Sequence, residues 1–538
     1  LIFCSQFVFA QFIFAQNDSD KIKNSASNSH REIVYEFYKL QDSKNTTRPD
    51  WATGNYFKFT ISPQKFSYPI LKHRLNVPLS FIEYENAYPF YVEAMKEFDK
   101  VKNERLRICW QSEEYQKTDR NDYDKIQQLE YNYFPIYMPY SIEKFTKRVS
   151  AAKEAEIYDK LSHVYKLLEK GSRSRYYKWG DSNDLNGIYT DLSCVQDARF
   201  LGRYLSSKAD WEIRNGRYDD ATKTIRVGLA LGDHIMNSAP SNFLVSLLVG
   251  NAINGMIQRQ ILHLIAQPNA PNLYPELTQL RPHFPLLTDA ISSEQTGFVF
   301  TKSIKSEIWD NYENLSSAEC KQIIEQITGV CSVLNIDDFY LNAENFRIRK
   351  NDETRLLFLF CAFSYQPAKE RLRERGMSDE KINSLSIYQV IAPYAIEKIS
   401  HAYGLVNVSV TLKSHNLRDS KTFIGDNWIL QELTICSSVD YLLRLLLPAS
   451  QGAMKSIERT DQFYDLVKII EAIRYYAAVH DGKLPESLDA IKETPVPKIC
   501  LLSGKPYVYK VEGKTITIDY VSGFDSIKLD SRLELVVE

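Results

Sequence analysis

Glu294 is the carboxylate in this sequence whose surroundings most favour a chemical role, because it lies among apolar neighbours in a predicted helix. One interpretation is acid–base chemistry with a second carboxylate across a cleft, the arrangement that hydrolyses glycosidic bonds. The other is a buried, structural ion pair with Arg281 or Arg259. Glu471 and Arg474, three residues apart on another predicted helix, fit an ordinary intrahelical pair.

The local motifs of the common enzyme classes are absent from the sequence. It contains no G-x-S-x-G nucleophile elbow, no H-E-x-x-H zinc motif, no phosphate-binding loop and no G-x-G-x-x-G dinucleotide fingerprint. S-x-x-K matches, among them those at Ser62 and Ser150, are short enough to arise by chance. His480 falls in the last turn of a predicted helix, where the helix dipole favours a capping role. The sequence therefore predicts no cofactor and identifies no catalytic residue.

Seven cysteines follow Cys4, and their spacing does not predict a metal site. They are scattered, without C-x-x-C pairs or histidines at zinc-ligand spacing. An exported chain could form disulfides among them, and the nearest couple is Cys320 with Cys331. An odd number leaves at least one thiol free unless it bonds to another chain. The seven are Cys109, Cys194, Cys320, Cys331, Cys361, Cys436 and Cys500.

The composition excludes two classes of protein. The 538 residues are 44% hydrophobic, which indicates a globular chain with a sizeable core and not a disordered one. Lys and Arg total 66 against 68 Asp and Glu, for a formal net charge of −2. The sequence has no dense basic stripe interleaved with aromatics, so it predicts no nucleic-acid partner.

Residues 1–16 form an uncharged apolar run that ends abruptly at a polar stretch. This pattern is typical of a secretory signal peptide, with Ala10 and Ala15 as candidate residues before the cleavage site. The alternative is a short membrane anchor, although the run is shorter than the ~20 residues that a span needs. Residues 17–50 follow as a polar tether, with one short helix expected around 32–39. The first segment therefore predicts export to the periplasm or cell envelope.

Residues 51–140 are crowded with Tyr and Phe. One interpretation is an aromatic platform that binds a glycan or a peptide. The alternative is that these rings fill a core, since aromatics make up 12% of the whole chain and large rings mostly pack inside. The positions include Tyr56, Phe57, Phe59, Phe66, Tyr68, Phe81, Tyr84, Tyr88, Phe90 and Tyr91.

Three consecutive helices between residues 197 and 266 are expected to organise the fold. The first ends at Asn215-Gly216, because Gly accepts the left-handed conformation that closes a helix. The second carries Gly228 and Gly232 on one face, which would let a neighbouring backbone approach closely. The third begins after Pro240 and is apolar nearly all round, so it should be buried.

Further helices and a final change of pattern complete the expected architecture. From about residue 460 the chain shows one amphipathic helix over 463–477 and then a two-stranded hairpin over 507–518. The predicted fold class is mainly α: a multi-helix body with a small C-terminal α+β module of a helix plus a β-hairpin. Other helices are expected over 141–170, 286–312, 315–334, 353–376, 384–403 and 428–447, the last stopping at Pro448, and a short strand over 406–412.

These changes divide the chain into four parts. A signal peptide or short anchor (1–16) precedes the polar tether (17–50) and a mainly helical body (51–448). The body comprises the aromatic-rich part, 51–140, and the central helices, 141–448. The small α/β module covers 460–538.

Three stretches of the sequence together resemble a known family, over roughly residues 80–520. That family is an uncharacterised group of exported, mostly helical proteins of planctomycete-type bacteria. The C-terminal module is also locally similar to the globular ends of type II secretion pseudopilins, but it has Ile499-Cys500 where those commonly have Asp-Pro. The family resemblance implies export and a helical fold, and it brings no activity, cofactor or catalytic residue. The stretches are Glu85-Asn86-Ala87 with Pro89 and Tyr91; Pro271 to Leu280 followed by Glu294; and Glu471 to Ala478, Gly482 to Leu488 and Ser503 to Tyr509.

Two functions fit these observations. The first is a non-catalytic interaction or scaffold protein whose partner is another envelope protein, with membrane contact only through residues 1–16 if they stay uncleaved. One tetratricopeptide-like helical hairpin, matched at 216–221 and without a second copy, favours a protein partner by analogy. The alternative is an exported, glycosidase-like hydrolase that uses carboxylates, Glu294 among them, in a cleft.

Overall fold

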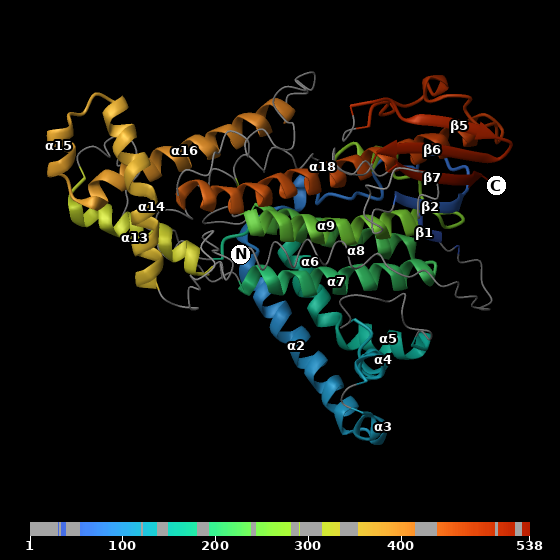
Figure 1. Cartoon of the computed structure of the whole chain (residues 1–538). Coiled ribbons are helices and arrows are strands. Elements are labelled where there is room, and N and C mark those ends of the chain that lie inside the picture. The colour runs from blue at the N-terminus through green and yellow to red at the C-terminus, as the bar shows by residue number, and fades with distance from the viewer. Residues whose placement is uncertain are drawn as a thin grey trace.

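The fold is taken from a computed structural model of the chain. Its helices form a central bundle and a lobe at one end, and its strands form a sheet at the other end (Figure 1). Within the described residues the chain is mainly helical with few strands, which confirms the predicted fold class. The structure describes residues 31, 34–38, 54–119, 122–136, 149–179, 193–237, 244–280, 290, 315–333, 353–414, 438–500, 504–521 and 530–537.

The central bundle consists of the three consecutive helices that the sequence predicts. They are α7 (Ser193–Arg214), α8 (Tyr218–Met236) and α9 (Leu244–Ile265), and each packs against the other two. Gly216, which follows α7, has φ +69°, the left-handed conformation expected at a helix end. α9 is buried over most of its length, in agreement with its apolar sequence.

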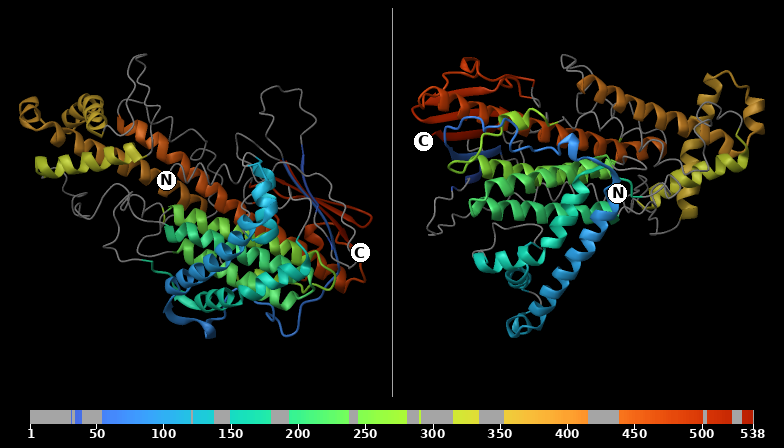
Figure 2. Two further views of the ribbon diagram at one scale, coloured as in Figure 1. Left: turned by 90° about the horizontal axis from the view of Figure 1, so that it is seen from below. Right: turned by 180° about the vertical axis from the view of Figure 1, so that it is seen from behind.

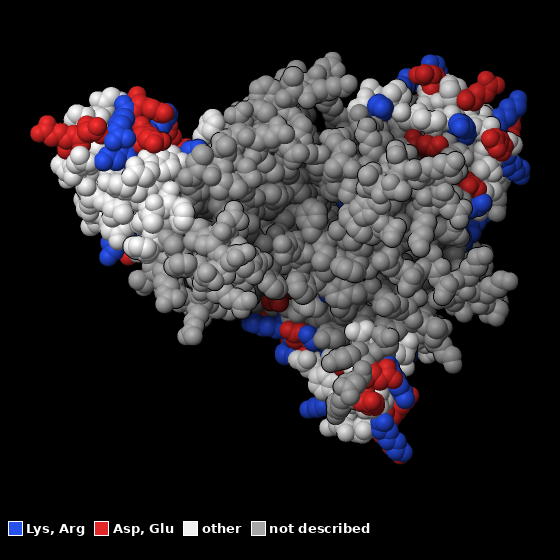
Figure 3. Space-filling view, in the orientation of Figure 1, with Lys and Arg blue, Asp and Glu red and all other residues white. Residues whose placement is uncertain are grey.

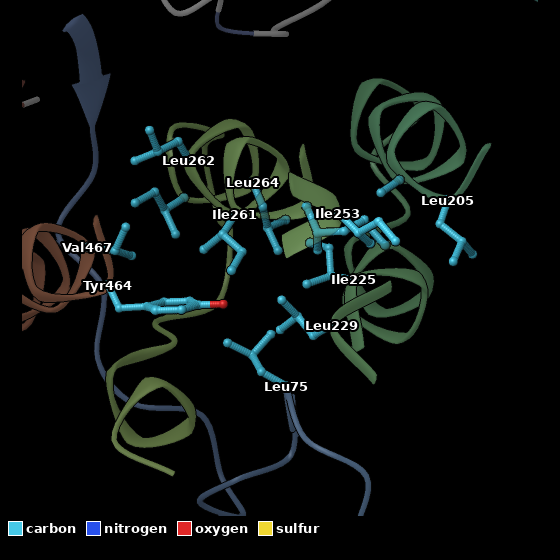
Figure 4. Close-up of a cluster of buried hydrophobic side chains, with 14 of the residues drawn as sticks. Leu75, Leu205, Ile225, Leu229, Ile253, Ile261, Leu262, Leu264, Tyr464 and Val467 are labelled. Atoms are coloured by element: carbon cyan, nitrogen blue, oxygen red, sulfur yellow. The ribbon is translucent and has the colours of Figure 1, made fainter. Parts of the chain in front are cut away.

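One continuous core joins this bundle to distant parts of the chain. In Figure 4, Ile225 of α8 and Ile253 of α9 lie on one side of the cluster, and Tyr464 and Val467 of the long helix α18 (Ser438–Val479) lie on the other. Leu75, from the segment that precedes α2, reaches the same cluster. Each of the five side chains is at most 5% exposed, so segments from both halves of the chain share this core.

The two glycines of α8 lie where α9 comes closest. A Cβ added to Gly228 would lie 2.4 Å from Cδ1 of Ile257, and one added to Gly232 would lie 2.0 Å from Oδ1 of Asn254. Gly250 of α9 sits opposite, since its added Cβ would be 2.5 Å from the carbonyl oxygen of Gly232. The predicted close approach of the two backbones is confirmed.

A helical arm projects from the bundle. It is built on α2 (Tyr88–Gln111), which packs on α6 (Ser162–Ser172) and extends away from the bundle in Figure 1. Its far end carries α3 (Glu113–Lys117) and α4 (Tyr123–Tyr133), while α5 (Ala151–Lys160) leads into α6. A small separate cluster of Cys109, Tyr115 and Leu129 packs this end of the arm.

The lobe contains α13 (Ser317–Val333), α14 (Glu353–Glu374), α15 (Asp379–Ser384) and α16 (Ile387–Ser414). The predicted strand over 406–412 is wrong, because these residues continue α16. Val406 and Val410 are four positions apart, as are Val408 and Leu412, so the same pattern suits a helix once the preceding turns are helical. The helix expected over 286–312 lies outside the described residues except for position 290.

α18 is 42 residues long and runs from the lobe to the sheet. The sequence predicts a helix end at Pro448, but α18 continues through this residue. A proline inside a helix removes one hydrogen bond and crowds the preceding turn, which is costly for an isolated helix. Packing of α18 on α9, α14 and α16 outweighs that local cost. The predicted boundary between 448 and 460 therefore falls inside one helix.

The sheet combines strands from both ends of the chain. Its order is β1-β2-β7-β6-β5, with β1 (Val34–Tyr38), β2 (Gly54–Ile61), β5 (Val508–Glu512), β6 (Thr515–Val521) and β7 (Asp530–Val537). The predicted hairpin is present as β5 and β6. β2 pairs in parallel with β7, so the segment before the helical body completes the C-terminal sheet.

The short helix expected around 32–39 is wrong, since Val34 to Tyr38 form β1, which pairs antiparallel with β2. Three of its five residues are aromatic, a composition that favours a strand once a partner is present. The sequence reading misses this strand because the partner lies in a separate segment.

Candidate functional site

The ion pair of Glu471 and Arg474 is fully enclosed, with both side chains 0% exposed. Nη1 of Arg474 donates to Oε1 and Oε2 of Glu471 at 3.0 and 2.9 Å. Nε donates to the carbonyl oxygen of Ser62 at 3.0 Å, and Nη2 donates to that of Ala270 at 2.8 Å. The sequence predicts only an intrahelical pair, whereas the structure shows a junction of α18 with two other segments.

Asn272 strengthens the same junction. Its Nδ2 donates to the carbonyl oxygens of Glu471, at 2.9 Å, and of Gln64, at 3.1 Å. Beside it, the Phe66 ring stacks on Tyr475 with centroids 3.9 Å apart. Burial raises the pKa of Glu471 to about 7, although the guanidinium of Arg474 acts in the opposite direction. The junction has no exposed atom of the ion pair to offer a substrate, so its role is to hold three segments together.

A second buried carboxyl group, that of Glu276, lies on the short helix α10 (Tyr274–Leu277). Its side chain is 2% exposed, and Oε1 accepts a hydrogen bond from the backbone N–H of His73 at 3.2 Å. Oε2 has no hydrogen-bond partner among the described residues. Burial raises the pKa of Glu276 and lowers that of His73, whose Nδ1 lies 3.4 Å from Oδ1 of Asp219.

The carboxyls of Glu276 and Glu471 interact electrostatically. A glycosidase requires two carboxyl groups that face a bound sugar and its attacking water. Both of these side chains are almost completely buried, so the pair does not offer that arrangement.

The aromatic residues between 51 and 140 divide into two groups. Phe59 and Tyr91 are 3% and 4% exposed and belong to the core, as the packing interpretation expects. Tyr68, Phe81 and Tyr84 are 95%, 57% and 87% exposed, which fits the alternative of a binding surface. The segment that carries them joins β2 to α2 and can be followed from behind in Figure 2.

We call four exposed side chains of this region the aromatic surface: Leu79, Phe81 and Tyr84 of this segment, and Tyr176 of the strand β4, which pairs with β3. It spans the 3₁₀ turn η1 (Leu79–Phe81) and the parallel pair β3 (Glu83–Asn86) and β4 (Ser174–Tyr176). Cζ of Arg173 lies 6.0 Å from the centroid of the Phe81 ring, so a cation borders the patch.

Asn86 fixes the strand that carries Tyr84. Its Oδ1 accepts from the backbone N–H of Lys178 at 2.8 Å, and its Nδ2 donates to the carbonyl oxygen of Lys178 at 2.6 Å. The same Oδ1 accepts from the backbone N–H of Tyr88 at 3.1 Å, next to the start of α2. The patch is therefore held on a rigid support.

The remaining sequence candidates have structural roles or lie outside the described residues. Glu294 is outside them. Ser150 caps α5 by accepting from the backbone N–H of Lys153, which explains one S-x-x-K match. His480 follows the last residue of α18, and its Nε2 lies 2.6 Å from Oε1 of Glu493. The structure thus brings none of these residues into a common site.

Cys320 and Cys331, the couple nearest in sequence, do not form a disulfide bond with each other. Both lie on α13, eleven positions apart, which separates them by roughly 16 Å along a helix axis and exceeds the reach of a disulfide. Cys320 is a free, buried thiol. No three His, Cys, Asp or Glu side chains in the described ranges are grouped closely enough to hold a metal ion.

Sequence reasoning misses Glu276 and His73, although Glu276 lies inside one of the family-like stretches. The signal available was a carboxylate in the turn after Pro271 and Asn272, but nothing local indicates burial.

None of the helices that the structure describes combines the length and apolar character needed to cross a membrane. Charges of both signs intermingle on the described part of the face in Figure 3, at the lobe, the arm and the sheet.

Comparisons of the chain with protein-family models, with curated proteins and with solved structures find no match.

Proposed function

We propose that this protein is a non-catalytic interaction protein of the bacterial envelope and that its aromatic surface binds another envelope protein. The exposure of Leu79, Phe81, Tyr84 and Tyr176, at 78%, 57%, 87% and 47%, carries the proposal. Large apolar side chains gain free energy when a partner removes them from water. Aromatic residues and Arg are the types enriched at the energetically important positions of protein interfaces.

The rigidity of the support adds to this proposal. Asn86 ties β3 to residue 178, so the rings of the surface need little ordering when a partner binds. A preformed surface loses less conformational entropy on association, which favours binding.

Placement in the envelope rests on the sequence. Residues 1–16 have the pattern of a signal peptide, and the family resemblance is to exported proteins. The hydrolase alternative rests on Glu294, and no observation among the described residues favours it.

Cross-linking in intact cells followed by mass spectrometry tests the proposal. The Phe81→Ala/Tyr84→Ala double variant should lose a partner that the unaltered protein captures, because half of the aromatic surface is removed. Phe358→Ala is the matched control, since Phe358 is 71% exposed but lies on α14 in the lobe.

Recovery of the same partners with the double variant contradicts this assignment of the surface. Hydrolysis of a cell-wall glycan that is lost in Glu294→Gln, with the fold retained, would instead decide for the enzyme.

A further inference from the structure

His234, in the last turn of α8, joins this helix to two other segments at a point that we call the His234 junction. Its Nδ1 lies 2.7 Å from the hydroxyl oxygen of Tyr91, in the first turn of α2. Its Nε2 lies 3.0 Å from the carbonyl oxygen of Ser174, the first residue of β4. Tyr91 and Ser174 are 4% and 5% exposed, so both residues that His234 contacts are buried. The junction therefore ties the start of the arm, and the strand that carries Tyr176 of the aromatic surface, to the bundle.

These contacts assign the proton on the imidazole ring. A carbonyl oxygen only accepts hydrogen bonds, so Nε2 carries the hydrogen and donates it to Ser174. Nδ1 is then the acceptor, and the hydroxyl group of Tyr91 donates to it. This hydroxyl group makes no other hydrogen bond to the described residues. The neutral form of His234 thus satisfies every polar group at the junction.

Protonation of Nδ1 disrupts this arrangement. An imidazolium ring has an N–H group at both nitrogens, so the N–H at Nδ1 would face the O–H of Tyr91. The hydroxyl group would have to turn its hydrogen away from the ring and leave it unpaired, which is costly for a buried donor. The Tyr91 ring has little room to adjust, because a Cβ added to Gly171 of α6 would lie 2.5 Å from its Cε1. A proton on His234 therefore weakens the contact between α8 and α2.

The surrounding groups favour the neutral ring at neutral pH. Burial lowers the pKa of His234 and outweighs the carboxylate of Asp233 and the bond to a backbone carbonyl, which both raise it. Asp233 itself accepts from Nδ2 of Asn254 on α9 at 3.2 Å. Burial raises the pKa of Tyr91 and of Tyr177, whose ring centroid lies 5.9 Å from that of Tyr91, so both phenols stay neutral. Of these groups, His234 is the one expected to change charge between about pH 8 and about pH 5.

We propose that the His234 junction is a pH-sensitive switch: protonation of His234 at acid pH loosens β4 and the start of α2, and with them the support of the aromatic surface. β4 pairs with β3, which carries Tyr84, and the backbone N–H of Ala87 donates to the carbonyl oxygen of Tyr176 at 2.9 Å. Loosening of β4 therefore reaches both strands of the surface. A less ordered surface loses more conformational entropy on association, so partner binding should weaken. This last consequence rests on the proposed function, whereas the switch itself is tested without a partner.

Amide hydrogen exchange of the full chain, corrected for the intrinsic effect of pH, tests the switch. Protection of residues 83–91 and 174–176 should decrease between about pH 8 and about pH 5. In His234→Gln this protection should be equal at both pH values, because an amide offers a donor and an acceptor and does not titrate. His163→Gln is the matched control, since His163 is exposed on α6, and it should keep the pH-dependent decrease.

Nuclear magnetic resonance titration of the histidine side chains identifies the group responsible. The resonance that is missing in His234→Gln should titrate with a pKa below the ordinary value of 6.5. Tyr91→Phe keeps the ring that packs on α6 but removes the hydroxyl group, so the neutral imidazole loses its donor and the pKa of His234 should rise. Thermal unfolding at about pH 8 establishes that the variants are folded.

Equal protection of these residues at both pH values in the unaltered protein overturns the proposal. An equal decrease in His234→Gln, or a pKa of His234 at or above 6.5, overturns it as well. Cross-linking at the same two pH values separates the switch from the proposed function. A partner that is lost at the lower pH by the unaltered protein, but kept by His234→Gln, supports regulation of the aromatic surface. Capture that does not change with pH overturns the effect on binding, and failure to capture any partner at either pH contradicts the proposed function while the exchange result still decides the switch.

Discussion

At the scale of single residues, Arg474 is the side chain on which the most distant contacts depend. Its guanidinium group bonds to Ser62, Ala270 and Glu471, three positions that are far apart in the sequence. The side chains of Arg474 and Glu471 are both shielded from water, so losing one of them leaves the other without a solvent partner.

At about pH 8, above the raised pKa of Glu471, we expect Glu471→Gln to destabilise the protein by ~3–5 kcal/mol, because Arg474 would keep a buried charge without its carboxylate. The matched control is Asp379→Asn, which removes the partner of the exposed Arg373 and should cost less than ~1 kcal/mol. Urea unfolding followed by circular dichroism measures both. Similar small losses in the two variants would mean that the buried pair contributes no more than a surface pair.

The pKa values of Glu276 and Glu471 are both raised in the folded state, which gives a defined pH dependence. A raised carboxyl pKa means that the folded protein holds the proton to higher pH than the unfolded chain does. The corresponding stability is present below the ordinary value of 4.5 and is lost as pH rises through the folded pKa, for Glu471 about 7.

The unaltered protein should therefore lose stability relative to Glu276→Gln as pH rises above about 4.5. The quantity to follow is the difference between their free energies of unfolding. Taking the difference removes the opposite contribution of His73, whose pKa is lowered. Chemical unfolding at several pH values between about 4.5 and 7 measures it. A difference that does not vary with pH would show that Glu276 titrates normally.

Two glycines provide a matched test of the packing between α8 and α9. Gly232→Ala should lower the melting temperature, because its Cβ would meet Oδ1 of Asn254 at 2.0 Å and the carbonyl oxygen of Gly250 at 3.0 Å. Gly255→Ala on α9 has no atom within 4 Å of the added Cβ and should stabilise the helix by up to ~1 kcal/mol. Scanning calorimetry of both variants checks the prediction. An unchanged melting temperature for Gly232→Ala would contradict the close approach.

At the scale of elements, the sequence predicts well where a local signal exists. Gly216 ends α7, and the apolar run that becomes α9 indicates burial without reference to any other segment. β1 and β2 lack such a signal, because β1 pairs with β2 across an intervening segment and β2 pairs with β7 at the other end of the chain.

The candidate site residues are likewise predicted only where a local sequence signal exists. The pair of Glu471 and Arg474 is visible in the sequence because three residues separate them on one helix. The exposure of Tyr84 and Phe81 is a property of the fold, since their sequence context does not separate them from the buried Tyr91.

Deletion of residues 460–538 tests whether the C-terminal module is separate, as the sequence predicts. The deletion cuts α18 within its contact with α9 and removes β7, the partner of β2. We therefore expect the remaining chain to lose cooperative unfolding and to be cut rapidly by proteases. A truncated chain that unfolds cooperatively, with the α7–α9 bundle protected from proteolysis, would support the separate module instead.

At the scale of the whole molecule, the bundle, lobe and sheet are connected by a single helix. α18 contacts the lobe through α14 and α16, and the bundle through α9. The aromatic surface lies on η1, β3 and β4, next to the start of α2.

The parallel pairing of β2 with β7 also constrains when the sheet can form during synthesis. Tyr56 emerges from the ribosome long before its partner Arg532, which lies 476 positions later (532 − 56). Until then β1 and β2 can form only a two-stranded ribbon, which is marginal in water and exposes an unpaired edge. Contacts of such high sequence separation form slowly, and the sheet stays incomplete until β7 has been synthesised. Because β7 lies between β2 and β6, a chain truncated before Asp530 would leave that edge of β2 unpaired.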